Sequence, residues 1–131
     1  MAVARRPDFF KAASAGAPVV RWEDYDTHYT ERYIGLPSEN PEAYRVSDVT
    51  TYAKDLKQPL LIIHGMRDDT VLFKDTLALV QRLILADRPV ELAVLPDAPH
   101  GWDTKGLAQS RYAFSRLVEF FERHLKPTAS P

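Results

Sequence analysis

LLIIHGMRDDTV, residues 60–71, is the run around which the other elements of this chain are placed. Its first four residues are apolar and two of them are β-branched, which is typical of a short strand buried on both faces of a parallel sheet. His64 and Gly65 end the strand, and Asp68 and Asp69 follow on the loop at its carboxyl end. Open α/β sheets hold their ligands and catalytic groups at the carboxyl ends of their strands. We therefore expect chemistry at this edge.

A second strand is predicted at residues 90–96, VELAVLP, and it also runs into a loop with a titratable side chain, His100. Parallel strands end at one edge of a sheet, so Asp68 and His100 are expected on neighbouring strand ends. A carboxylate that orients an imidazole is the arrangement of a general base. The spacing of 32 residues alone does not separate this role from that of loop-capping or surface groups.

The remaining pattern alternates strands with helices. A strand is predicted within residues 9–20, a helix over 72–86 packed through Phe73, Leu77, Val80 and Ile84, and a helix over 107–125 packed through Phe114, Leu117, Phe121 and Leu125. This order implies an α/β fold with about three parallel strands, flanking helices and right-handed crossovers. Residues 1–126 are expected to form one domain and residues 127–131 a disordered tail.

Aromatic residues recur three or four positions apart between the first two predicted strands. Trp22, Tyr25, Tyr29 and Tyr33 are thereby predicted to lie along one face of a single helix that ends at Gly35. Such a stripe is more often part of a core than of a binding site, and the residues alone leave both interpretations open.

Composition excludes several classes of function. The 131 residues are 45% apolar with a net charge of -1, which fits a globular protein and offers no basic field for nucleic acid. The chain has no cysteine, and His28 and His124 have no partner at metal-binding spacing, so no metal site is expected. No apolar run approaches the roughly 20 residues that span a bilayer. With a start too short and polar for a secretory signal, the sequence as written predicts a cytoplasmic protein.

Three motifs in order resemble the catalytic domain of prolyl oligopeptidase-family serine peptidases, and the dipeptidyl peptidase four branch is nearest. They are APVVRWEDYD with YTERYIGLP at 17–37, HGMRDDTV at 64–71 and PDAPHG at 96–101. The resemblance runs from about Pro7 to Lys126 and implies the C-terminal portion of an α/β-hydrolase fold with its early strands missing. It assigns Asp68 as the triad aspartate and His100 as the triad histidine, while Asp69 matches a second acidic residue outside the triad.

The resemblance also gives the aromatic residues a role. It implies that Val19, Trp22, Tyr25, Tyr29 and Val71 line the pocket for a proline or alanine side chain of a peptide substrate. Large flat rings suit a pyrrolidine ring because they offer apolar area at low entropic cost. Thr70 stands where the family usually has an asparagine that binds a substrate carbonyl. No cofactor or metal is implied, and His64 is expected to be a structural, hydrogen-bonding histidine.

One element of the family pattern is absent from these residues. The sequence contains no Gly-x-Ser-x-Gly nucleophile elbow. We therefore expect this chain to supply Asp68, His100 and the aromatic pocket to a serine carried elsewhere, in a peptidase that cleaves after proline or alanine. The alternative is a non-catalytic truncated remnant or interaction module. In either case the first strand would leave an unpaired sheet edge, which predicts self-association or pairing with another chain.

Overall fold

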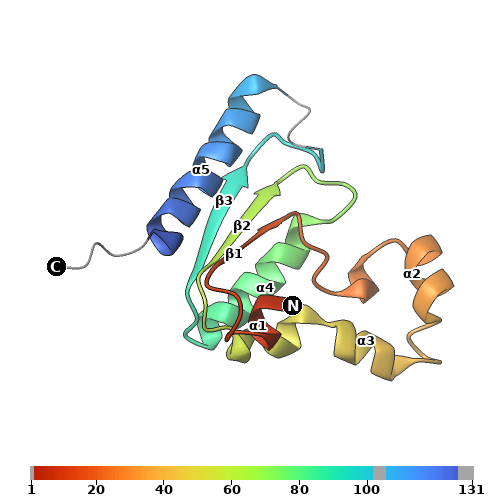
Figure 1. Ribbon diagram of the computed structural model, residues 1–131. Coiled ribbons are helices and arrows are strands. Elements are labelled where there is room, and N and C mark those ends of the chain that lie inside the picture. The colour runs from red at the N-terminus through yellow and green to blue at the C-terminus, as the bar shows by residue number, and fades with distance from the viewer. Residues whose placement is uncertain (1, 102–105, 127–131) are drawn as a thin grey trace.

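The computed structural model describes residues 2–101 and 106–126 (Figure 1). Along the chain the elements are α1 (Ala2–Arg5), β1 (Ala13–Gly16), the 3-10 helix η1 (Trp22–Asp24), α2 (Thr27–Ile34), α3 (Pro41–Ser47), the 3-10 helix η2 (Val49–Asp55), β2 (Leu60–Gly65), α4 (Phe73–Leu85), β3 (Val90–Leu95) and α5 (Leu107–Leu125). The predicted strands and the last two predicted helices are found at their expected places. The expected tail lies outside the described residues.

The strands form one parallel sheet in the order β1-β2-β3. β2 lies in the centre, with Leu60 opposite Ala13 on one side and opposite Val90 on the other. All six residues of β2 are buried, as its uninterrupted apolar sequence predicts for a strand covered on both faces. The predicted α/β arrangement of three parallel strands with flanking helices is therefore confirmed.

Alternate residues of β2 serve two separate hydrophobic cores. Leu60 and Ile62 pack with residues of α1, η2 and α4 on one face of the sheet. Leu61 and Ile63 pack on the other face, against a cluster that contains Ala113 and Phe120 of α5 and residues of β3. Figure 1 shows α5 on one side of the sheet, with α4 and α1 on the other. His64 follows this alternation and faces α4, which brings it toward Thr76.

The packed face of α4 differs from the prediction. Its buried residues are Asp75, Thr76, Leu79 and Leu83. Leu77 and Ile84, predicted to be packed, are 47% and 61% exposed. The helix carries more apolar residues than one face can bury, so periodicity alone admits more than one facing. In the structure, the face with Leu79 and Leu83 packs against the core that contains Leu60 and Ile62 of β2.

The packed face of α5 differs in a similar way. Ala113 and Phe120 are fully buried, and Leu117 and Phe121 are partly buried beside them. Phe114 and Leu125, which were predicted to pack, are 53% and 50% exposed. A small side chain lets a helix lie close to a sheet. The face of α5 that contains Ala113 therefore packs on the sheet, and the face with the bulkier Phe114 does not.

The predicted single aromatic helix is wrong, because the segment forms two elements. η1 ends at Asp24, and α2 begins at Thr27 with Asp26 as its N-cap, whose carboxylate accepts a hydrogen bond from the His28 amide at 2.8 Å. Aspartate is among the strongest N-cap residues, so Asp26 favours a new start over a continuous helix. The helix ends at Gly35 as predicted, where φ is +78°.

Candidate active site

Two loops at the carboxyl edge of the sheet hold each other in place. The Met66 amide donates to the Leu95 carbonyl at 3.0 Å, and the Arg67 amide donates to the Ala98 carbonyl at 3.0 Å. Ala98 is fully buried between them. The loop after β2, which carries Asp68, is thereby joined to the loop after β3, which carries His100.

Asp68 is a buried carboxylate with donors on both oxygens. Its Oδ1 accepts hydrogen bonds from the backbone amides of Thr70 at 3.0 Å and Val71 at 2.8 Å. Its Oδ2 lies 2.9 Å from Nδ1 of His100 and 3.1 Å from Nε2 of His64. Burial acts to raise the pKa of Asp68, but the hydrogen bonds from His100 and the two amides outweigh it and hold the pKa below its usual value. The group is therefore a carboxylate at neutral pH.

His100 meets this carboxylate through one ring nitrogen. With Nδ1 directed at Asp68, the Nδ1–H tautomer is the one that donates to a carboxylate, and Nε2 lies on the opposite edge of the ring. The His100 side chain is 47% exposed whereas that of Asp68 is fully buried. A buried carboxylate that orients a half-exposed imidazole has the geometry of the aspartate and histidine of a Ser-His-Asp triad. The structure thus brings together the two residues that the sequence singled out.

The neighbouring Asp69 takes no part in this pair. Its side chain is exposed, and its Oδ1 lies 3.5 Å from the Thr70 hydroxyl, at the limit of hydrogen-bond distance. Thr70 is exposed as well and meets Asp68 through its backbone amide. The two adjacent carboxylates therefore differ in environment, and Asp68 is the one that meets His100.

The aromatic side chains form one cluster although their helix is broken. The Trp22 ring stacks on that of Tyr29 with centroids 5.9 Å apart, and the Tyr25 ring meets both edge-on at 5.6 and 5.8 Å. Tyr33 extends the cluster from Tyr29 at 4.8 Å. The rings are not part of the hydrophobic cores, and Tyr29 is 48% exposed. Among the described residues, the aromatic cluster is therefore separate from the two hydrophobic cores.

Polar contacts tie the aromatic segment to the first turn of α4. The Val20 amide donates to Oδ2 of Asp75 at 2.9 Å, and Lys74 donates to Asp24 at 2.6 Å. Arg21 forms an ion pair with Asp24 as well. Since α4 begins directly after the loop of Asp68, these contacts place the aromatic segment relative to that loop.

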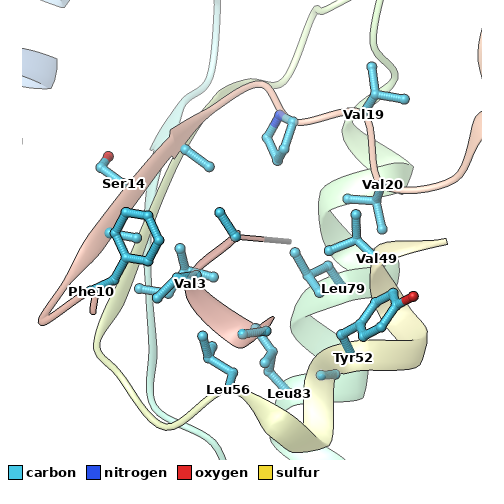
Figure 2. A pocket seen from close by; sticks show the side chains of 17 residues that line it. Val3, Phe10, Ser14, Val19, Val20, Val49, Tyr52, Leu56, Leu79 and Leu83 are labelled. Carbon is cyan, nitrogen blue, oxygen red and sulfur yellow. The ribbon is translucent and has the colours of Figure 1, made fainter. Parts of the chain in front are cut away.

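The other residues expected in the substrate pocket are placed differently from the rings. Val71 is buried, its amide bound to Asp68 and its carbonyl oxygen 2.9 Å from Nε2 of His64. Val19 lines an apolar pocket of about 270 Å³ beside β1, which Figure 2 shows with side chains from α1, η2 and α4 converging on it. Neither Asp68 nor His100 lines that pocket.

Sequence reasoning missed two buried polar residues in this region, Thr76 and Asp75. Both lie on α4 and are at most 2% exposed. Their positions on the packed face of an amphipathic helix were the available signal, but the predicted facing of α4 directed them away from the core. Thr76 contacts His64 and Asp75 contacts Val20.

Two further observations concern the ranges 2–101 and 106–126 alone. No group of three or more His, Asp or Glu side chains there is arranged to hold a metal ion. No helix within the same ranges has the length and apolar character needed to span a membrane.

Comparison with known proteins shows the family. Residues 1–128 match the sequence profile of the Prolyl oligopeptidase family. The chain belongs to this family. The chain is 41% identical over 103 residues to dipeptidyl peptidase 8 of Mus musculus. The match covers 76% of this chain and 12% of the relative. It is also 41% identical over 95 residues to dipeptidyl peptidase 4 of Bos taurus, covering 70% of this chain and 12% of the relative.

Solved structures of the family agree with the fold. Dipeptidyl peptidase 4 of Porphyromonas gingivalis matches with a TM-score of 0.84 at 34% identity, over 88% of this chain and 16% of that chain. The three strands and their helices are therefore part of an α/β-hydrolase domain of the dipeptidyl peptidase type, as the resemblance implied. The chain spans 12% of the length of the curated relatives named above.

Proposed function

We propose that this chain supplies the aspartate and histidine of a Ser-His-Asp triad in a serine peptidase. The observation that carries the proposal is the 2.9 Å contact between Nδ1 of His100 and Oδ2 of the buried Asp68. In the complete site, Nε2 of His100 takes the proton of the serine hydroxyl during attack and later gives it to the leaving amine. Asp68 holds the imidazole in the Nδ1–H tautomer and stabilises the imidazolium that forms.

The serine in this proposal lies outside residues 1–131. These residues contain no Gly-x-Ser-x-Gly sequence, and they correspond to 12% of the relatives' length. Without the serine nucleophile no acyl-enzyme forms, so we propose that the 131 residues alone do not hydrolyse peptides.

The proposed substrate is a peptide with proline or alanine before the cleaved bond. The relatives' names describe dipeptidyl peptidases, and the rings of Trp22, Tyr25 and Tyr29 offer a flat apolar surface for a pyrrolidine ring. Val19, Val71 and Thr70 are proposed to complete this pocket. Thr70 has a shorter side chain than asparagine and no amide N–H, so we propose a weaker hold on the substrate carbonyl than in relatives with asparagine.

The proposed protein partner is a strand that pairs with the open edge of β1. The Ala13 and Ala17 amides donate to the Pro59 and Ile63 carbonyls of the β2 side, so the groups of Ser14 and Gly16 point to the opposite edge. The apolar pocket beside β1 lies against the same strand (Figure 2). A partner strand with its own apolar cover would satisfy the free backbone groups and bury that pocket.

A chimeric enzyme tests the function directly. Residues 2–126 replace the matching segment of dipeptidyl peptidase 8, and hydrolysis of a chromogenic Xaa-Pro substrate is measured. We expect activity that the variants His100→Ala and Asp68→Ala abolish, whereas Asp69→Asn retains it. A folded chimera whose activity is absent, or does not depend on His100, contradicts the proposal and favours a non-catalytic module.

The location of the serine is tested on the chain itself. The purified 131-residue chain is exposed to a fluorophosphonate, and its intact mass is measured beside that of His100→Ala. We expect no adduct in a folded sample. An adduct that requires His100 would reveal a nucleophile within these residues and overturn the placement of the serine elsewhere.

A further inference from the structure

Oδ2 of Asp68 contacts two imidazole rings, that of His100 and that of the buried His64. His64 is fully buried, and its Nε2 lies 2.9 Å from the Val71 carbonyl oxygen and 3.1 Å from Oδ2 of Asp68. A carbonyl and a carboxylate are both hydrogen-bond acceptors. Nε2 must therefore carry a proton, which it shares between the two oxygens.

The other nitrogen of His64 has a partner suited to this tautomer. Nδ1 lies 2.7 Å from the hydroxyl oxygen of Thr76, which is also fully buried. A hydroxyl donates as well as accepts, so with the proton of the neutral ring on Nε2 the Thr76 hydroxyl donates a hydrogen bond to Nδ1. The Phe73 ring packs edge-on against the imidazole with centroids 5.4 Å apart, which holds the plane of the His64 ring.

We propose that Thr76 and His64 are positioning residues that act on His100 through Asp68. Thr76 holds His64 in its Nε2–H tautomer, and His64 then directs Oδ2 of Asp68 toward Nδ1 of His100. The inference deepens the proposed function and rests on it for its catalytic meaning.

The arrangement restrains the Asp68 carboxylate at both of its oxygens. Two backbone amides hold Oδ1, and two imidazole nitrogens converge on Oδ2. The carboxylate turns about its Cβ–Cγ bond, which moves both oxygens together. The His64 proton, anchored from α4 through Thr76, gives Oδ2 a donor that such a rotation would break, in addition to the contacts with the Thr70 and Val71 amides at Oδ1. An apolar residue of similar volume at position 64 would fill the space without giving Oδ2 a donor.

Imidazole nitrogen NMR of the full chain tests the proposal without any need for peptidase activity. Histidine is labelled with 15N, and one-bond and long-range 1H–15N correlations are recorded for wild type, His64→Leu, His64→Gln, Thr76→Val and Thr76→Ser. In the wild type we expect His64 to carry its proton on Nε2 and His100 to show a hydrogen-bonded Nδ1–H proton.

The variants separate positioning from packing. We expect His64→Leu to lose or broaden the Nδ1–H signal of His100, and His64→Gln, whose amide N–H is able to replace Nε2–H, to keep more of it. Thr76→Val, which matches threonine in shape, should shift the Nδ1 nitrogen of His64 and weaken the His100 signal, and Thr76→Ser should resemble wild type. Amide spectra of uniformly 15N-labelled samples, read at residues of α5, report that each variant is folded.

Each outcome decides the proposal. A proton on Nδ1 of His64 in the wild type overturns it, and so does an unchanged His100 signal in folded His64→Leu. If His64→Leu does not fold, Thr76→Val and Thr76→Ser decide: identical His64 and His100 signals in these two variants contradict the role of Thr76. Failure of the chimera to hydrolyse peptides would refute the proposed function while leaving these spectra as they are.

Discussion

Gly65 lies directly against the backbone of Ala98. A Cβ added to Gly65 would come within 2.3 Å of the Ala98 carbonyl oxygen and 2.8 Å of the Pro99 carbonyl oxygen. The end of β2 and the loop that carries His100 therefore pack together without room for a side chain. This approach of two backbones is what allows Asp68 and His100 to meet.

Gly65→Ala should separate the proposed catalytic pair. The added methyl group meets backbone atoms, which have no alternative rotamer, so the loop of residues 96–100 must move away from β2. We expect a loss of about 1–3 kcal/mol in the free energy of unfolding, measured by urea denaturation, together with loss of the His100 Nδ1–H signal.

Gly35→Ala is the matched control. A Cβ there would meet only Asn40 Cβ, at 3.8 Å, but φ is +78°. With ψ at −178°, Gly35 lies in a region essentially restricted to glycine, so the variant should cost about 1–3 kcal/mol through backbone strain alone and leave the His100 signal unchanged. Equal effects of the two variants on that signal would show that the contact between Gly65 and Ala98 does not position His100.

Asp68→Asn should alter how stability depends on pH. The pKa of Asp68 is lowered in the folded chain, so its contribution is fully present above the unfolded pKa and is lost as pH falls through the folded pKa. At neutral pH the variant should be less stable by about 1–3 kcal/mol, because donors that faced a carboxylate now face an amide.

Urea denaturation over a pH series measures this difference. The unfolding curves of Asp68→Asn and wild type should converge in acid. Asp69→Asn, at the exposed neighbouring carboxylate, should stay within about 0.5 kcal/mol of wild type throughout. A destabilisation by Asp68→Asn that is the same at every pH would mean that shape, rather than charge, is responsible.

Asp75→Asn should show the opposite dependence on pH. Burial raises the pKa of Asp75, with a smaller contribution in the same direction from Asp24, against the opposing effects of the Val20 amide and Arg21. A raised pKa in the folded chain means stability that is fully present below the unfolded pKa and is lost as pH rises through the folded pKa.

An uncharged isostere removes that loss. Asparagine keeps an oxygen for the Val20 amide, which donates to Asp75 at 2.9 Å, and it carries no charge to bury. In the same urea series we expect Asp75→Asn to be more stable than wild type near neutral pH and to approach it in acid. The opposite result would be a variant that is less stable than wild type at neutral pH and equally stable in acid. That result would mean that the carboxylate charge of Asp75 stabilises the fold.

The open edge of β1 should make the chain associate. We expect sedimentation velocity to show species larger than a monomer that grow with concentration, because within residues 2–101 and 106–126 no strand pairs with Ser14 and Gly16 on the side away from β2. Ser14→Pro removes a donor on that side and should reduce association while the fold is retained.

Ala15→Pro is the matched control for the edge. It removes a donor that points toward β2 and leaves a carbonyl of β2 without its partner, so it should destabilise the fold by about 1–3 kcal/mol. A wild-type chain that sediments as a folded monomer at all concentrations would contradict the proposed partner strand.

The local pattern of the sequence was enough to predict much of this protein. Four consecutive apolar residues before His64 predicted the central strand, and the alternation of strands and helices predicted a parallel sheet. The two polar loops that follow β2 and β3 pointed to Asp68 and His100. These features depend on neighbours within a few positions or on the general geometry of parallel sheets, which is why one sequence reveals them.

The helix faces and the aromatic segment show where local pattern was insufficient. α4 and α5 each carry apolar residues on more than one face, and the sheet selected Leu79 and Ala113 in preference to Leu77 and Phe114. Asp26 is the N-cap of α2 and lies within the aromatic repeat, whose spacing continues across this break between two elements. Periodicity describes a helix by itself and does not specify the surface that it meets.

Tertiary structure alone decided how the proposed active site is held. The contact of Thr76 with His64 crosses 12 positions, that of Asp68 with His100 crosses 32, and Gly65 matters because of the backbone of Ala98. The residue types at these positions were visible in the sequence, whereas their separations depend on strand register and on how closely two loops and a helix approach. Hydrogen bonds and backbone contacts act over a few ångströms, so only the folded arrangement determines which of them form.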